Sequence, residues 1–68
     1  MKKLYVADRE TGTFMDEVSS VDEGIKLIRQ FEDEDKANDD YVEGFYEIVN
    51  EEHETVFSDY YGISREKA

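Results

Sequence analysis

The 68-residue chain has room for one small domain, and its 19 acidic residues against 8 basic ones give a formal charge of −11. It contains no cysteine, which excludes a disulfide framework and a thiolate metal site. The acidic charge argues against direct binding to nucleic acid, because the phosphate backbone is itself a polyanion.

Two strands joined by a tight turn are expected near the N-terminus. Residues 3–8 carry apolar side chains on both faces of an extended chain, as is typical of a central strand. Gly12 can adopt the positive φ that closes a short hairpin loop. That loop pairs Asp8 with Phe14 and leads into a second strand, whose inward-pointing Asp16 is typical of a sheet edge.

This register sorts the side chains of the hairpin onto two faces. The face expected to meet a helix holds Leu4, Val6, Phe14 and Val18. The opposite face holds Tyr5, Ala7, Met15 and Glu17. The hairpin is therefore predicted to supply one wall of the hydrophobic core.

A helix is expected to begin after Ser20. Ser20 and Glu23 match a capping box, in which the serine hydroxyl accepts a hydrogen bond from the Glu23 amide and the Glu23 side chain reaches back to Ser20. Apolar side chains then recur at helical spacing, at Val21, Ile25, Ile28 and Phe31. Gly24 lies on the same face, and since glycine costs about 1 kcal/mol in a helix interior, we expect it to mark close packing against the sheet. The helix is predicted to end near Lys36.

The rest of the chain predicts a third strand and leaves room for a fourth. Residues 45–49 form the third strand, antiparallel to the first, and residues 55–57 allow a short fourth. With the first strand central, the strand order is 2-1-3 and the helix covers one face. The predicted fold class is α+β, a small ββαβ sandwich with a three-stranded sheet over residues 1–57. Residues 58–68 form a C-terminal tail that is expected to dock on the sheet.

The sheet face away from the helix is expected to be rich in apolar side chains, namely Tyr5, Ala7, Met15, Phe45 and Val49. An uncovered patch of that kind is unusual in a monomer. Either a second chain packs there, or the tail folds back over it. The side chains that the fold-back would place on this face are Phe57, just before the tail, and Tyr60, Tyr61 or Ile63 within it. The expected state is therefore a monomer or a weak homodimer.

Acidic residues concentrate in the second half of the chain. Residues 32–57 contain eleven Asp and Glu and one basic residue, Lys36. The densest part consists of Glu32, Asp33, Glu34, Asp35, Asp39, Asp40 and Glu43. Calcium is one alternative ligand, but an EF-hand loop starting at Glu32 would have Lys36 and Ala37 where an oxygen ligand and a glycine are required. A solvated surface without a metal is the favoured interpretation.

The sequence contains no recognisable catalytic machinery. It has no G-x-S-x-G motif and no glycine-rich phosphate loop, and its one histidine, His53, lies in an expected turn among glutamates. We therefore expect neither enzymatic activity nor a cofactor. A small secreted domain usually needs disulfides, and this chain has no cysteine to form them. No apolar run approaches the ~20 residues of a membrane span. The N-terminus reaches an acidic residue at Asp8, unlike a signal peptide. A cytoplasmic location away from membranes is predicted.

Three segments resemble a known group of proteins: residues 5–13 (YVADRETGT), 21–25 (VDEGI) and 45–49 (FYEIV). They are similar to small acidic uncharacterised proteins carried on conjugative transposons of clostridia and related bacteria. The resemblance covers roughly residues 3–52. It implies an origin on a bacterial mobile element and carries no functional residues over to this chain.

Two functions are compatible with the sequence. The first is a non-enzymatic protein-interaction module of a mobile element, with a basic protein as its partner. Its binding surface would be the acidic residues 32–43, the outer sheet face with Tyr5 and Met15, or both. The alternative is an acidic nucleic-acid mimic that inhibits a DNA-binding protein, since dense carboxylates imitate the charge of a duplex.

Overall fold

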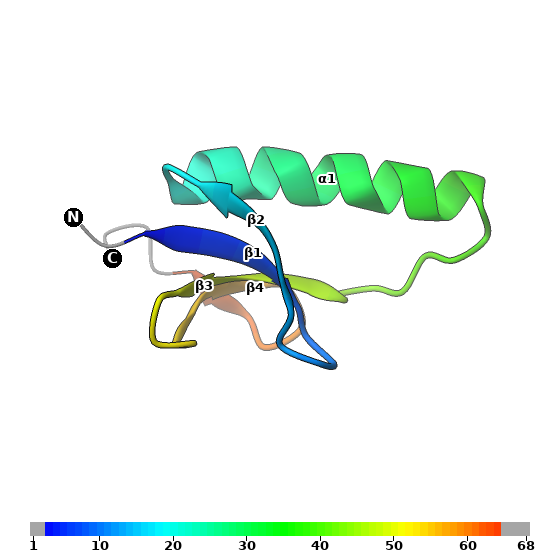
Figure 1. The fold of residues 1–68 in the computed structure, drawn as a ribbon. Helices are drawn as coiled ribbons and strands as arrows, with labels where there is room; N and C mark the ends of the chain where they lie inside the picture. The colour runs from blue at the N-terminus through cyan, green and yellow to red at the C-terminus, as the bar shows by residue number, and fades with distance from the viewer. Residues whose placement is uncertain (1–2, 65–68) are drawn as a thin grey trace.

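The computed structural model describes residues 3–64 and shows an α+β fold, in which one helix covers one face of an antiparallel sheet (Figure 1). The elements are β1 (Leu4–Asp8), β2 (Phe14–Val18), α1 (Val21–Ala37), β3 (Tyr46–Asn50), β4 (Thr55–Ser58) and β5 (Ile63–Ser64). The strands lie in the order β2-β1-β3-β4-β5. The order of the first three strands is therefore confirmed, and the sheet has five strands rather than three.

The segment after β4 extends the sheet at its edge. β5 pairs with β4 at Ser58 and Ile63, and the turn between them has Gly62 at a φ of +67°. The expected short fourth strand is confirmed, and the first part of the expected tail continues the sheet beside it. Residues 65–68 of that tail lie outside the described residues.

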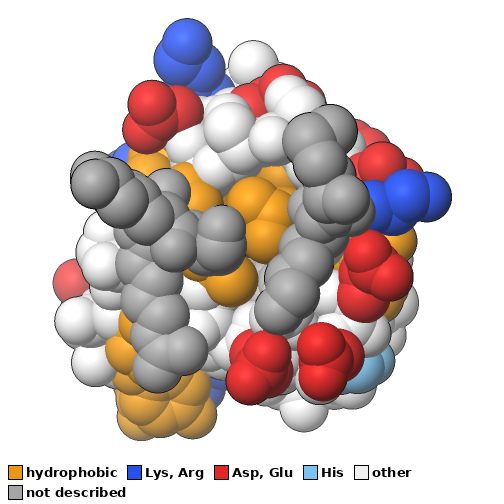
Figure 2. Space-filling view, turned by 90° about the vertical axis from the view of Figure 1, so that its left-hand side faces the viewer, with side chains coloured by type: hydrophobic (Ala, Val, Ile, Leu, Met, Phe, Trp, Pro, Cys, Tyr) orange, Lys and Arg blue, Asp and Glu red, His pale blue; other side chains and the backbone are white. Residues whose placement is uncertain are grey.

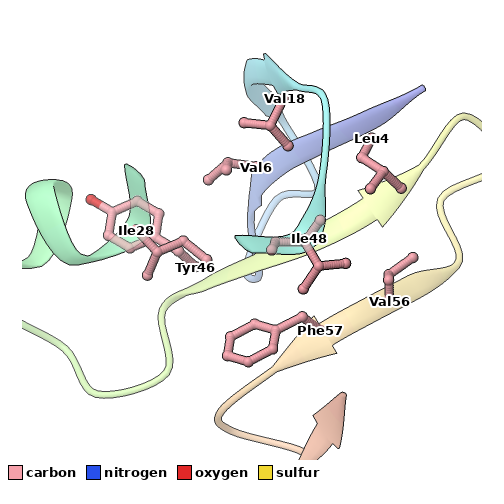
Figure 3. Close-up of a cluster of buried hydrophobic side chains, with 9 residues drawn as sticks. Leu4, Val6, Val18, Ile28, Tyr46, Ile48, Val56 and Phe57 are labelled. Carbon is pink, nitrogen blue, oxygen red and sulfur yellow. The ribbon is translucent and has the colours of Figure 1, made fainter. Parts of the chain in front are cut away.

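The hydrophobic core lies between α1 and the sheet, and its side chains point toward one another (Figure 3). It consists of Leu4, Val6, Val18, Val21, Ile28, Tyr46, Ile48, Val56 and Phe57. Ile25 and Phe31 pack against this cluster from the helix, so the apolar face of α1 is the one that the helical spacing predicts. Since each fully buried apolar side chain stabilises the fold by ~1.5–3 kcal/mol, this cluster is the main source of stability.

The first turn of α1 has one of the two expected capping hydrogen bonds, and the expected contact of the Glu23 side chain with Ser20 is replaced by one with Ser19. The Ser20 hydroxyl accepts a hydrogen bond from the Glu23 amide at 3.1 Å. The Glu23 carboxylate accepts one from the Ser19 hydroxyl at 2.6 Å, whereas a complete capping box would have it accept from the Ser20 amide. Gly24 faces the sheet and packs directly against Ile48, which confirms the expected close approach of helix and sheet.

The prediction that Phe14 joins the helix-facing core is wrong, because the hairpin contains a β-bulge. Phe14 pairs with Ala7, whereas the expected partner of Phe14 was Asp8. Met15 is thus the extra residue on β2, and a shift of one residue moves Phe14 to the other face of the sheet. There its side chain is 38% exposed and its ring stacks on that of Tyr5.

Aromatic rings of the chain itself cover part of this second sheet face. Phe14 stacks on Tyr5 and on His53 from the β3–β4 turn, with ring-centroid distances of 4.3 and 4.7 Å. Ala7 pairs with Phe14 and Val49 pairs with Tyr5, so both lie on this same face. Both are buried. The cover therefore comes partly from the hairpin and from the β3–β4 turn, whereas the expected cover was the tail or a second chain.

The expectation that Phe45 lies on this second face is also wrong. β3 begins at Tyr46, so Phe45 precedes the strand and follows Gly44, whose φ of +69° turns the chain. The Phe45 ring packs edge-on against Tyr46, with centroids 5.0 Å apart, beside the core. The turn at Gly44 therefore decides where this ring lies.

Candidate protein-binding surface

The acidic segment begins on the last turns of α1, which extend past the end of the sheet (Figure 1). Five of its seven carboxylates are exposed: Asp33, Glu34, Asp39, Asp40 and Glu43. Asp39 has a φ of +58°, a left-handed conformation that Asp tolerates better than most residues. It lies just after the helix, where the chain turns back toward β3. The fold thus presents these carboxylates on a projecting part of the molecule.

Glu32, by contrast, is only 6% exposed and is held within the fold. Arg29 Nη1 lies 2.9 Å from Glu32 Oε1 and 3.0 Å from Asp59 Oδ2, so one guanidinium joins α1 to the β4–β5 turn. The hydrogen bonds to Glu32 and Asp59 raise the pKa of the Arg29 guanidinium. These are the only ion pairs formed among residues 3–64. Glu32 is therefore engaged by Arg29 within the fold and does not face solvent.

Asp35 also has a partner within the fold. The Tyr46 hydroxyl donates a hydrogen bond to Asp35 Oδ2 at 2.7 Å. Burial and, to a smaller extent, this hydrogen bond raise the pKa of Tyr46 to about 12. The seven predicted acidic residues therefore divide into two that are engaged inside the fold and five that face solvent.

Exposed apolar residues lie in the α1–β3 loop, beside the exposed carboxylates, and in the β4–β5 turn. Tyr41 and Val42 directly precede Glu43 in the loop between α1 and β3, and both are exposed. Tyr60 and Tyr61, in the β4–β5 turn, are 59% and 60% exposed, and their rings meet edge-on. A single exposed tyrosine needs no explanation, but two such pairs beside a group of carboxylates form a mixed surface.

Close backbone packing holds the loop and the turn together. A Cβ at Gly44 would lie 2.8 Å from Tyr60 Cβ. Arg9 Nε donates a hydrogen bond to the Gly44 carbonyl at 2.9 Å, and Arg9 Cζ lies 3.9 Å from the centroid of the Tyr60 ring. We name the surface formed by these two segments and the end of α1 the acidic–aromatic surface. It comprises Asp33, Glu34, Asp39, Asp40, Tyr41, Val42, Glu43, Tyr60 and Tyr61.

Two of these tyrosines already contact a cation. Arg9 lies over the Tyr60 ring, and Lys36 Nζ lies 4.8 Å from the centroid of the Tyr41 ring. Such contacts contribute ~0.5–1 kcal/mol at exposed sites. A surface of carboxylates and tyrosine rings attracts guanidinium and ammonium groups and repels anions. Its chemistry is therefore that of a surface for basic side chains.

The other two predicted binding residues lie elsewhere. Tyr5 is half-buried and stacks against Phe14 on the sheet face opposite the helix. Met15 is exposed at the bulge of the edge strand β2. The structure therefore does not bring Tyr5 and Met15 to the acidic–aromatic surface, and the predicted residues occupy two separate regions.

Tyr41 and Val42 were not among the predicted binding residues, and Tyr60 and Tyr61 were expected to cover the sheet. A signal was present, since both pairs stand in short segments of Asp, Glu and Gly, which are typical of loops. An apolar side chain in such a segment has few apolar neighbours to pack against. The exposure of both pairs therefore follows from the composition of their segments.

Metal binding finds no support in the geometry. Among the residues that the structure describes, no three carboxylate or histidine side chains converge as metal ligands. Figure 2 shows the histidine, in pale blue, next to acidic side chains at the end of the molecule where α1 begins. His53 has a φ of +63° and stacks on Phe14, and its neighbours Glu51, Glu52 and Glu54 are exposed.

Comparisons with protein-family models, with curated proteins and with solved structures find no match to this chain. The resemblance to proteins of conjugative transposons therefore stays a prediction. Within the described range 3–64, no helix has both the length and the apolar composition needed to cross a membrane.

Proposed function

We propose that this chain is a non-enzymatic protein-interaction module that binds a basic protein through the acidic–aromatic surface. One observation carries the proposal. The segment from Asp33 to Glu43 carries five exposed carboxylates and two exposed large apolar side chains, the β4–β5 turn that Gly44 packs against adds two exposed tyrosines, and no cation of residues 3–64 forms an ion pair with those carboxylates. The resemblance to proteins of conjugative transposons supports a role as a cytoplasmic accessory protein of a bacterial mobile element.

A mixed surface of this kind suits a specific protein partner. Exposed carboxylates steer a basic partner toward the surface and raise its association rate. Tyrosine rings bury apolar area on contact and hold arginine side chains, which is why tyrosine is enriched at interface hot spots. The contact of Arg9 with Tyr60 is an example of this interaction within the fold itself.

Affinity capture from a bacterial lysate with matched variants tests the proposal. The D40K/E43K variant reverses two charges on the acidic–aromatic surface, and the E10K/E52K variant makes the same change of charge at two exposed turn residues elsewhere. We expect a protein that is captured by the unaltered chain and by E10K/E52K and is lost with D40K/E43K. Capture that is unaffected by D40K/E43K contradicts the proposal.

An acidic nucleic-acid mimic is the second candidate, and the eleven acids against one lysine in residues 32–57 favour it. A mimic replaces phosphate contacts, so its complex weakens steeply with salt, by orders of magnitude between about 50 and 200 mM. A complex that depends on the tyrosines keeps most of its affinity over that range. A captured partner that binds DNA, and that releases its DNA when this chain is added, identifies the mimic.

A further inference from the structure

A groove of about 380 Å³ lies between the edge strand β2 and residues 23–30 of α1. β2 forms one edge of the sheet, and four of its five residues are exposed. The groove is lined by Asp16, Glu17, Val18, Glu23, Lys26, Leu27 and Gln30. It lies outside the acidic–aromatic surface, and the proposed function does not use it.

The lining of the groove has an apolar part and an acidic part. Val18 is buried and belongs to the core cluster, and Leu27 packs against that cluster from the helix. Three of the other lining residues are acidic, against the single cation Lys26. The groove therefore suits a ligand that carries an apolar side chain flanked by positive charges.

The backbone of β2 shows how such a ligand would be held. The Glu17 amide donates a hydrogen bond to Asp16 Oδ1 at 3.0 Å, so a side chain of β2 itself is an acceptor for this N–H group. An extended peptide lying along β2 would present its own carbonyl to this amide, as in β-strand addition. The Asp16 carboxylate would then be released to pair with a basic side chain of the peptide.

A second copy of this chain fits the groove poorly. Pairing two β2 strands would bring Asp16 and Glu17 of each copy close to the same acids of the other, and each copy has a formal charge of −11. Like charges placed directly opposite each other in a sheet are destabilising. The acidic residues along this edge therefore oppose self-association and favour a basic strand.

We propose that the groove between β2 and α1 binds an extended basic peptide segment as a sixth strand beside β2. An apolar side chain of the segment inserts between Val18 and Leu27. Lysine or arginine side chains on either side of it meet Asp16, Glu17 and Glu23. The Glu17 amide then donates its hydrogen bond to a carbonyl of the peptide backbone and no longer to Asp16 Oδ1.

An NMR titration of the full ¹⁵N-labelled chain tests this proposal. The probe is the acetylated and amidated peptide Thr-Lys-Arg-Val-Arg-Lys-Thr, whose alternating side chains direct the valine and both lysines to one face of a strand. We expect shifts of the amides of residues 15–19 and 23–30, saturating at a peptide concentration below a few millimolar. The same peptide with proline in place of valine is expected to bind at least fivefold more weakly, because proline lacks the isopropyl group of valine and has no amide donor.

Two variants of equal charge change locate the binding site. Glu17→Lys lies in the groove, and Glu34→Lys lies on the exposed part of α1 in the acidic–aromatic surface. We expect Glu17→Lys to weaken the peptide complex at least fivefold and Glu34→Lys to weaken it less than twofold. The absence of saturable shifts, equal binding of the proline peptide, or a larger loss with Glu34→Lys would each overturn the proposal. Such results would leave the acidic–aromatic surface to be tested by its own variants.

Discussion

A Cβ atom at Gly24 would lie 2.5 Å from the Cδ1 atom of Ile48 and 3.0 Å from its Cγ1 atom. Ile48 is fully buried in the core, so its side chain has little room to move. α1 can approach β3 this closely because position 24 has no side chain. The glycine costs about 1 kcal/mol in helix propensity, and the packing of the helix on the sheet offsets that cost.

Replacing this glycine with alanine is predicted to lower the stability of the protein. Gly24→Ala gains about 1 kcal/mol in helix propensity, but overpacking a filled core typically costs ~1–3 kcal/mol. We expect a net loss of about 1 kcal/mol, measured by urea unfolding with circular dichroism. Ile48→Val removes the Cδ1 atom, so Gly24→Ala should cost less in the Ile48→Val background. An equal cost in both backgrounds would show that the contact is unimportant.

The raised pKa of Tyr46 predicts a loss of stability at high pH. The folded state holds the phenolic proton up to a pKa of about 12, while the unfolded chain loses it near 10. The contribution of Tyr46 is therefore fully present below about pH 10 and is lost as the pH rises toward 12. Urea unfolding at pH 9, 10 and 11 should show a steeper fall of the unfolding free energy for the unaltered chain than for Tyr46→Phe.

Asp35→Asn separates the two causes of this shift. Burial is the larger cause, and the hydrogen bond to Asp35 is the next. The asparagine carbonyl still accepts from the hydroxyl but carries no charge, so most of the pH dependence should remain in this variant. A pH profile of Asp35→Asn that matches that of Tyr46→Phe would mean that the carboxylate, and not burial, dominates.

Removing Arg29 is predicted to destabilise the fold more than an exposed ion pair ordinarily would. Exposed pairs contribute ~0–1 kcal/mol, but Arg29→Met leaves the buried carboxylate of Glu32 without its cation. A buried charged group left unpaired costs more, so we expect a loss of about 2 kcal/mol in urea unfolding. The double variant R29M/E32M should recover most of it, whereas Asp59→Asn should cost less than about 1 kcal/mol. A double variant no more stable than Arg29→Met would contradict this account.

Local patterns in the sequence were sufficient for much of the fold. The cap at Ser20, the apolar face of α1 and the close packing at Gly24 each depend on residues within a few positions, and all three are confirmed. The position of Phe14 depends on one extra residue in β2, and a shift of one residue moves a side chain to the other face. β5 has two residues, which is too short for any periodic pattern to reveal.

The acidic residues show the same division between local and long-range information. Exposure of Asp33, Glu34 and their neighbours in the loop follows from composition alone. Arg29 pairs with Glu32, three residues later, and with Asp59, thirty residues later in the chain. Only the first of these partners can be recognised from helical spacing. The acidic–aromatic surface likewise requires Gly44 to meet Tyr60, a contact that the folded chain creates.

Salt is predicted to raise the thermal stability of this protein. Among residues 3–64 the only ion pairs involve Arg29, so most carboxylates repel one another in the folded state. Raising NaCl from about 10 to 300 mM shortens the screening length from about 30 Å to below 8 Å, which weakens this repulsion. We expect a gain on the order of 1 kcal/mol, or about 4–8 °C in Tm for a domain of this size. The D33N/E34Q/D39N/D40N/E43Q variant should gain less stability from the same rise in salt. An equal gain in this variant would place the repulsion outside the acidic–aromatic surface.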